Sequence, residues 1–165
     1  MSRKTEDGGT GQAEKRHFAE DVGLAFENEG MPRMAGRILG WLLVSEAPQV
    51  SLQELATILH ASKGSISTMS RLLMRMGVVE KVSLPGERRD YIRLKPGSWS
   101  DWFAEEVSKI GALRALAEHG LELVESKLPV SRERLEEMRD LFAFLEQEYP
   151  LLLERWQKKR RAGTR

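Results

Sequence analysis

The residues between positions 51 and 95 constrain the fold of this chain more than any other stretch. Two short patterns with apolar residues three and four positions apart come first, joined by a few residues. Two short patterns of alternating apolar and polar residues follow, joined by a Pro-Gly turn. Spacings of three and four are typical of amphipathic helices, and alternation is typical of strands. We therefore expect two short helices joined by a tight turn, and then a β-hairpin.

The two helices carry clear start and stop signals. Ser51 followed three residues later by Glu54 forms a capping box ahead of the first helix. Ser62 is a good N-cap for the second helix, which we expect over residues 63–76. Gly77 then stands at the C′ position, where a left-handed residue commonly ends a helix.

The hairpin pattern completes a recognisable motif. Residues 78–83 and residues 90–94 alternate and are rich in β-branched or aromatic side chains, so each predicts a strand. Residues 84–87 contain the Pro-Gly turn, which places Arg88 and Arg89 near its tip. Two helices joined by a short turn and followed by a small hairpin indicate a winged helix-turn-helix.

The remaining segments predict a helical scaffold. Residues 1–16 are polar and glycine-rich, which is typical of a disordered tail. Residues 17–97 should form two N-terminal helices and the winged helix-turn-helix, and residues 98–160 a C-terminal helical dimerisation region. Gly36 and Gly40 lie four positions apart on one helix face, so a neighbouring backbone can approach closely. The expected fold is mostly α with a small β-wing, with long N- and C-terminal dimerisation helices.

The C-terminal region is expected to contain two long helices. The first begins near Ser98 or Ser100 and ends at Leu128, and Ser131 caps the second. Apolar residues three and four apart form a heptad seam on the second helix. The seam consists of Leu135, Met138, Phe142, Leu145, Tyr149, Leu152 and Trp156.

This seam is the expected dimer interface, because it is too apolar to face water along its whole length. Packing on the preceding helix of the same chain is the alternative. A dimer is favoured because one winged helix reads only a few base pairs, and two half-sites about 34–36 Å apart increase both affinity and specificity.

Composition narrows the class of protein. The formal net charge is only +1, but residues 60–95 contain eight lysines and arginines against three acidic residues. A basic module on an otherwise acidic scaffold is typical of a nucleic-acid binder. No apolar run approaches the roughly 20 residues that a membrane span needs. Cysteine is absent, which excludes disulfides and thiolate chemistry, and we expect a cytoplasmic protein.

The second helix of the motif has an outward face rich in hydroxyl and basic groups, which suits contact with base edges and phosphates. An ordinary solvated face is the alternative, although serine is a weak helix former and its repeated use needs a reason. The candidate DNA-binding residues on this helix are Ser62, Lys63, Ser65, Ser67, Thr68, Ser70, Arg71 and Arg75.

Arginines on the hairpin give a second candidate contact with double-stranded DNA. Arg88 and Arg89 can reach phosphates or enter a narrow minor groove, and Arg93 lies further along the hairpin. A charged hairpin that merely prevents edge-to-edge aggregation is the alternative.

Three runs of the sequence together resemble a known family. They are GRILGWLLVSE, SLQELATILHASKGSISTMSRLL and VVEKVSLPGERRDYIRL, within residues 18–102. The combination resembles the GbsR-like branch of the MarR family of bacterial transcription regulators. The resemblance implies a homodimer of winged helix-turn-helix subunits that binds pseudo-palindromic operators, with contacts from residues 63–75 and from Arg88 and Arg89. Some members respond to small ligands such as choline, but no residue here carries that ligand over.

The expected function is therefore sequence-specific DNA-binding transcription regulation, by a dimeric repressor that responds to a small-molecule effector. The alternative is a winged-helix protein-protein interaction module without specific DNA binding. An aromatic cage from Trp99, Trp102, Tyr149 and Trp156 is one possible effector site, since such cages bind quaternary ammonium groups. Packing in the core or at an interface is the more ordinary role for these rings.

Catalysis finds no support in the sequence. The three histidines lack metal-ligand spacing, and the adjacent glutamate pairs diverge on a helix instead of converging on a substrate. We expect neither an enzyme nor a bound cofactor or metal.

Overall fold

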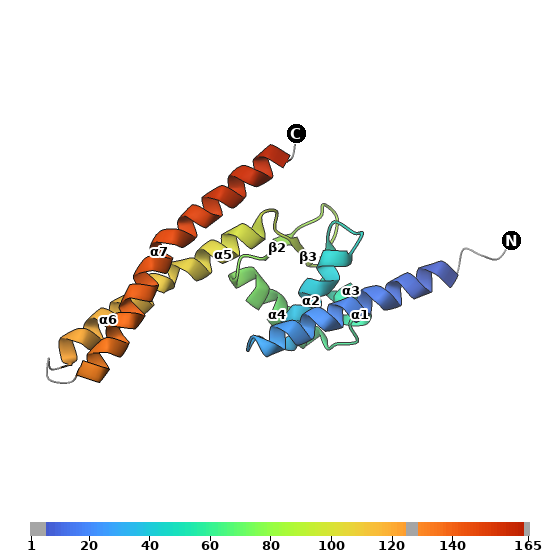
Figure 1. The fold of residues 1–165 in the computed structure, drawn as a ribbon. Coiled ribbons are helices and arrows are strands. Elements are labelled where there is room, and N and C mark those ends of the chain that lie inside the picture. Colours follow the sequence, from blue (N-terminus) through green and yellow to red (C-terminus); the bar gives the residue numbers. More distant parts are fainter. Residues whose placement is uncertain (1–5, 125–128, 164–165) are drawn as a thin grey trace. The chain divides into compact units, whose positions relative to one another are not determined.

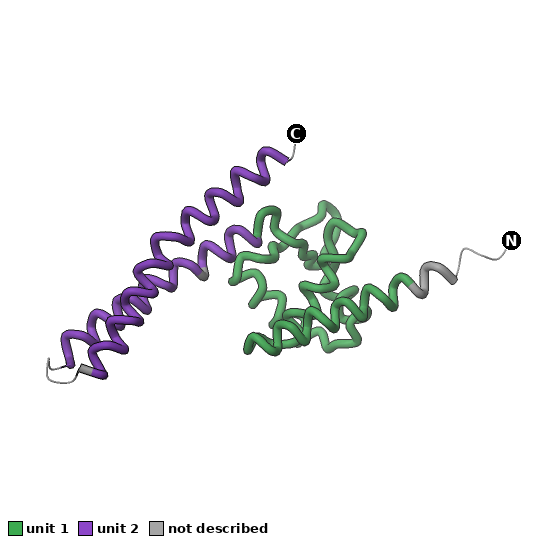
Figure 2. Tube along the Cα trace, viewed as in Figure 1, with its two compact units in different colours: residues 1–98 green, residues 99–165 purple. Residues whose placement is uncertain are grey.

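The structure is a computed structural model that describes residues 6–124 and 129–163, with side chains from residue 11 onward except at positions 106 and 129. The chain divides into two compact units, one ending at Ser98 and the other beginning at Trp99 (Figure 2). None of the helices within the described ranges is long and apolar enough to cross a membrane.

The first unit contains a helix-rich fold with one small sheet (Figure 1). Its elements are α1 (Glu6–Asn28), α2 (Arg33–Val44), β1 (Val50–Ser51), α3 (Leu52–Ile58), α4 (Lys63–Arg75), β2 (Val79–Val82) and β3 (Tyr91–Leu94). The mostly α architecture with a small β-wing is the one that the sequence predicts.

The N-terminal helix is longer than the sequence predicts. Helix α1 begins at Glu6, so residues 6–16 are helical in the structure where a disordered tail was expected, and residues 1–5 lie outside the described residues. Once a helix is nucleated, each further residue adds a hydrogen bond at low cost, which lets polar residues extend it. An ion pair between Lys15 and Glu46 also ties this extension to the loop after α2.

Helices α1 and α2 cross at a backbone-to-backbone contact. A Cβ atom on Gly36 would lie 2.7 Å from the Val22 carbonyl oxygen, and one on Gly40 would lie 2.8 Å from the Ala19 Cα. Neither distance leaves room for a methyl group. The close approach predicted from these two glycines is confirmed, with α1 as the neighbour.

The core of the first unit forms around α2 and the two helices of the motif. Ile38 and Leu39 of α2 are fully buried, as are Leu55 of α3 and Ile66 and Leu73 of α4. Burying a branched or aliphatic side chain of this size contributes about 1.5–3 kcal/mol each. This shared core therefore determines which face of α3 and which face of α4 is buried.

The helix signals read from the sequence are confirmed. The Ser51 hydroxyl accepts a hydrogen bond from the Glu54 amide, and the Glu54 carboxylate accepts one from the Ser51 amide, which completes the capping box. The Ser62 hydroxyl accepts a hydrogen bond from the Ser65 amide at 3.1 Å. Gly77 has a φ of +71° directly after α4.

The wing is a three-stranded antiparallel sheet with the order β1-β3-β2. Strands β2 and β3 form the predicted hairpin, and Gly86 has a φ of +81° in its turn. Strand β1 was not predicted. It is two residues long, with Val50 opposite Ile92, and so short a strand has no periodicity to detect.

The second unit consists of helices and lacks strands in its described part. It contains most of α5 (Ser98–Ser108), then α6 (Ile110–Leu123) and α7 (Pro129–Gly163) (Figure 1). A single long helix was predicted where α5 and α6 stand. The helix is interrupted at Lys109, whose carbonyl accepts a hydrogen bond from the Ala112 amide in a tighter turn, with the weak helix former Gly111 alongside.

Two predicted boundaries in this unit also differ. The predicted end of the long helix at Leu128 lies outside the described residues, and α6 ends at Leu123. Helix α7 begins at Pro129, so Ser131 lies inside its first turn and is not its cap. Proline suits the first position of a helix, because its missing N–H has no partner there in any case.

The heptad seam of α7 packs largely on its own chain. A Cβ on Gly120 of α6 would lie 2.9 Å from Leu135 Cδ2, and the rings of Tyr149 and Phe103 meet edge to face with centroids 5.6 Å apart. Leu152 and Trp156 at the end of the seam are 47% and 48% exposed. Within this unit, therefore, much of the seam serves the packing of α5 and α6 against α7, the alternative left open by the sequence.

Candidate nucleic-acid interface

Helix α4 presents a polar and basic face because its apolar face is held in the core. Ile66 and Leu73 are fully buried, which turns the opposite side of the helix outward. The side chains left exposed are those of Ser62, Lys63, Thr68, Arg71 and Arg75, and Ser65 and Ser67 are half-buried. Seven of the eight residues predicted for this face therefore keep some access to solvent.

Ser70 does not belong to this face, contrary to the prediction. Its side chain is fully buried on the core side of α4, between Ile66 and Leu73 in the helical repeat. Its hydroxyl is buried without a hydrogen-bond partner in the described part of the chain. A residue in this position cannot contact DNA.

Two hydrogen bonds order the exposed face. The Ser62 side chain caps α4, so its hydroxyl is occupied by the Ser65 amide. Arg71 Nη2 donates to Thr68 Oγ1 at 3.4 Å one turn along the helix. The pair presents a hydroxyl and a guanidinium side by side, and these groups suit base edges and phosphate oxygens.

The arginines of the wing differ in their surroundings. Arg88 and Arg89 are exposed in the turn between β2 and β3. Arg93 instead lies opposite Glu80 in the hairpin, and its Nε is 2.6 Å from the Glu80 carboxylate. Lys81 Nζ similarly lies 2.7 Å from Asp90 Oδ1. Arg93 and Lys81 therefore stabilise the hairpin through these ion pairs, whereas Arg88 and Arg89 lie at its turn.

A polar recess joins the wing to α4. Arg89, Lys63 and Ser67 border a recess of about 260 Å³, together with Asp90 and the start of α3. Gln53 also borders it, although the sequence did not single this residue out. Its exposed position in the first turn of α3, next to the start of α4, was the available signal. The recess can receive an anionic oxygen, because two cations and a hydroxyl line it.

Arg89, which borders the recess, also acts on Glu54 of the capping box. Hydrogen bonds from the Ser51 hydroxyl and amide lower the pKa of Glu54, and the Arg89 guanidinium lowers it further. Glu54 is therefore a carboxylate that stabilises the start of α3.

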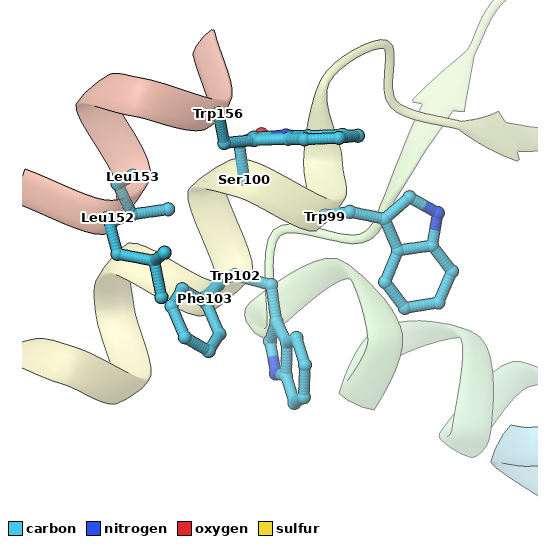
Figure 3. A pocket seen from close by; sticks show the side chains of 7 residues that line it. All are labelled: Trp99, Ser100, Trp102, Phe103, Leu152, Leu153 and Trp156. Carbon is cyan, nitrogen blue, oxygen red and sulfur yellow. The ribbon is translucent and has the colours of Figure 1, made fainter. Parts of the chain in front are cut away.

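A second, separate site lies within the second unit. Three tryptophans, a phenylalanine and two leucines of α5 and α7 line a pocket of about 430 Å³ (Figure 3). Trp99 and Trp102 meet edge to face with centroids 6.3 Å apart, and Trp156 Nε1 donates to Ser100 Oγ at 3.3 Å. Tyr149, expected as a fourth wall of an aromatic cage, packs on Phe103 and is not part of the lining.

The chemistry of this pocket is apolar. Among the described residues, none that lines it carries a charge, and Ser100 is the only hydroxyl. The described part of the chain holds no group of three or more His, Asp or Glu side chains that could together hold a metal ion.

Comparison with known proteins agrees with this geometry. A family profile described as "MmpR5-like MarR family transcriptional regulator" matches residues 97–160. The HTH-type transcriptional regulator MmpR5 of Mycobacterium tuberculosis (strain ATCC 25618 / H37Rv) is 42% identical over 129 residues, which are 78% of this chain and 78% of MmpR5.

Solved structures extend the comparison. A crystal structure described as a transcriptional regulator has a TM-score of 0.75 at 39% identity, and the match covers 88% of this chain and 99% of that chain. A mutant MarR from E. coli, complexed with operator DNA, has a TM-score of 0.38 at 16% identity, covering 76% of this chain and 84% of that chain.

The identity to MmpR5 extends over more than two thirds of both chains and settles the family. Proteins of this family are transcriptional regulators and not enzymes, in agreement with the absence of catalytic spacing in the sequence. The helix-turn-helix, the wing and the helical second unit are thus parts of one regulator: the chain belongs to the MarR family of winged-helix transcriptional regulators.

Proposed function

We propose that this chain is a dimeric repressor that binds a pseudo-palindromic operator through α4 and the wing. The observation that carries the proposal is the exposed face of α4, where hydroxyl and basic groups stand opposite the fully buried side chains of Ile66 and Leu73. A helix of this kind fits the major groove of B-DNA, whose base edges differ chemically.

The contacts divide by chemistry. Arg71 and Arg75 are the candidates for guanine or phosphate, and Thr68 shares a hydrogen bond with Arg71 that presents both groups together. Lys63, Ser65 and Ser67 stand near the start of α4, where backbone amides favour a phosphate. Arg88 in the wing turn reaches the minor groove or the backbone, and Arg89 joins Lys63 at the recess.

The dimer is proposed from the apolar surface that the second unit leaves uncovered. Exposed side chains on α7 include Leu141, Phe144 and Leu151, in addition to Leu152 and Trp156 of the predicted seam. Exposed apolar patches of this kind mark interaction sites. A second copy of α7 is the partner that would double the number of DNA-reading helices. The seam residues that pack on α5 and α6 hold α7 in place, and its exposed apolar side chains are then available for this interface.

The effector is proposed to bind the aromatic pocket of α5 and α7 (Figure 3). Its volume of about 430 Å³ is within the range of small-molecule sites, and its uncharged, mostly aromatic and aliphatic lining suits a predominantly apolar ligand. Binding there acts by favouring one spacing of the two DNA-reading units over another. Repression follows when the bound dimer excludes polymerase from the promoter, and the protein acts in the bacterial cytoplasm.

Two other readings of the sequence are weaker. A protein-protein interaction module without specific DNA binding is not favoured by membership of a family of transcriptional regulators. Within that family, the GbsR-like branch stays a prediction from the sequence.

Selection of bound duplexes from a random-sequence library tests the proposal. The full chain should enrich one pseudo-palindromic consensus, and Arg71→Ala or Arg75→Ala should weaken binding to it by about 1–3 kcal/mol if the arginine reads a base. Enrichment of no sequence, with binding that is equally weak to all duplexes, would reject operator recognition and leave the interaction module.

A further inference from the structure

Arg37 connects three elements of the first unit through one side chain. Its Nε lies 2.5 Å from Glu20 Oε2 on α1, while the residue itself stands on α2. Its Nη2 donates a hydrogen bond to the Leu59 carbonyl oxygen at 2.8 Å, where α3 ends. The Arg37 side chain is only 21% exposed. Arg37 belongs neither to the exposed face of α4 nor to the wing.

The carbonyl that Arg37 holds belongs to the turn of the helix-turn-helix. It is part of the peptide bond between Leu59 and His60, so a hydrogen bond to it fixes the plane of that bond. His60 has a φ of +48° and is the sole non-glycine residue with a positive φ in the described chain. L-residues other than glycine adopt this conformation only when their surroundings hold them in it. Arg37 supplies such a restraint.

Glu20 in turn holds Arg37 in place. Its carboxylate binds Arg37 through one oxygen and accepts a hydrogen bond from Arg33 Nη2 through the other, at 3.1 Å. The Arg37 Nε and Glu20 Oε2 atoms are buried, and their contact is an ion pair rather than a well-aligned hydrogen bond. A partly buried pair is screened by solvent less than one on the open surface.

A recess lies between residues of α1 and residues of the turn at this point. Residues of α1 and of the turn, including His17 and His60, border a recess of about 350 Å³ that Arg37 also lines. Arg37 therefore provides a polar link between α1 and the turn beside this recess. The turn determines the direction in which α4 leaves α3.

We propose that Arg37 is a positioning residue for DNA recognition, which sets the direction of α4 relative to α1 through Glu20 and the Leu59 carbonyl. The inference rests on the proposed function, because its effect is on operator binding. It follows that a displacement of α1 changes the conformation of the turn and therefore the fit of α4 to DNA.

Two matched substitutions test this role in the full chain. Arg37→Met removes the contacts with Glu20 and with the Leu59 carbonyl and keeps an unbranched side chain. Arg33→Met removes ion pairs with the same Glu20 and with Glu27 but no contact with the turn. Each variant is titrated with two duplexes of equal length. One carries the consensus that the wild-type chain selects from a random library, and the other is a scrambled sequence.

We expect Arg37→Met to weaken binding to the selected duplex about tenfold, equivalent to about 1.4 kcal/mol. Binding to the scrambled duplex should change less than twofold, because it depends on phosphate contacts. Arg33→Met should change both affinities less than twofold. Adding His60→Gly to Arg37→Met should restore part of the selectivity, since glycine adopts a positive φ without cost.

For each variant, the affinity for the selected duplex is divided by the affinity for the scrambled duplex. The proposal would be overturned if this ratio were the same in Arg37→Met and Arg33→Met. A parallel fall of both affinities together with the melting temperature, which indicates a merely structural role, would overturn it as well. If Arg37→Met does not fold, Arg37→Lys and Glu20→Gln replace it, with an expected loss of about threefold on the selected duplex alone. An unchanged ratio in these variants would equally overturn it.

Hydrogen exchange separates this proposal from the proposed function. If the wild-type chain selects no consensus, operator recognition fails, but the turn can still be examined. The Ala61 amide, in the turn, donates to the carbonyl oxygen of Ala56 in α3 at 3.0 Å. Its exchange should be faster in Arg37→Met than in Arg33→Met, and equal rates would show that Arg37 does not hold the turn.

Discussion

Ser70 lies on the core side of α4 and not on the face that we propose contacts DNA. Its hydroxyl is fully buried and has no partner among the described residues, and leaving such a group unsatisfied costs about 1–3 kcal/mol. We expect Ser70→Ala to raise the free energy of unfolding by about 1 kcal/mol, measured by urea denaturation. DNA affinity should not change.

The matched comparison is Ser67→Ala, because Ser67 is half-buried and borders the recess on the outward face of the same helix. This change should gain only the helix propensity of alanine, about 0.5 kcal/mol, and should weaken DNA binding. A Ser70→Ala variant that is less stable than the wild type would mean that the hydroxyl makes a stabilising bond.

Glu54 makes the stability of the motif depend on pH. Because its pKa is lowered in the folded state, the capping box contributes stability that is complete above the ordinary glutamate pKa of about 4.3. This contribution is lost as the pH falls through the lowered value. Glu54→Gln should therefore reduce the melting temperature most at neutral pH, and the difference from the wild type should vanish in acid. A difference that stays constant from neutral to acidic pH would show that the carboxylate charge is not involved.

The two exposed arginines of the wing should act through phosphates or the minor groove. Replacing both Arg88 and Arg89 by alanine should lower the slope of log affinity against log salt by about one for each phosphate that the variant no longer binds. Arg93→Ala serves as the control, since Arg93 already binds Glu80 across the hairpin. Unchanged affinity and slope in the double variant would exclude the wing from the interface.

The sequence could predict the place of a residue in the candidate site only where the apolar repeat of its own helix determines whether that residue is buried. Ser70 lies four positions after Ile66 and three before Leu73, so the apolar repeat itself places it in the core, a signal that the serine-rich composition of the helix obscured. The contacts of Arg37 were not predictable. They depend on three elements that meet only in the folded chain.

At the scale of elements, the crossing of α1 and α2 sets the position of the N-terminal helix. Gly36→Ala would place a Cβ 2.7 Å from the Val22 carbonyl oxygen, and the resulting overpacking should destabilise the chain by about 1–3 kcal/mol in urea denaturation. Gly11→Ala is the control on α1, because no neighbouring atom lies within 4 Å of its added Cβ. That variant should gain about 0.5–1 kcal/mol. Equal effects of the two substitutions would mean that the helices do not approach closely at Gly36.

Elements with strong terminal signals were predicted well. The bounds of α3, α4 and the hairpin strands follow from the capping box, from Ser62 and Gly77, and from the Pro-Gly turn. The start of α1, the two-residue strand β1 and the interruption at Lys109 were missed. The position of each of these features depends on tertiary contacts or on a single hydrogen bond, and neither can be inferred from the local sequence pattern.

At the scale of the whole molecule, the chain divides into two compact units, and the proposed function assigns DNA binding to the first and dimerisation to the second. The first unit contains α4 and the wing, and the second unit carries the exposed apolar side chains of α7. In the proposed complex one α4 reads a single half-site, so specificity for a pseudo-palindrome would require two copies of the chain. The proposed dimer is thus a consequence of how little DNA one reading helix can contact.

Purine methylation by dimethyl sulfate tests the central claim most directly, because it reports guanine N7 in the major groove and adenine N3 in the minor groove. On the selected duplex, the full chain should protect guanine N7 positions in two half-sites about one helical turn apart, with protection of adenine N3 beside them where the wing lies. Arg71→Ala should lose part of the N7 protection. An absence of N7 protection at a concentration that saturates the duplex would contradict the insertion of α4 into the major groove.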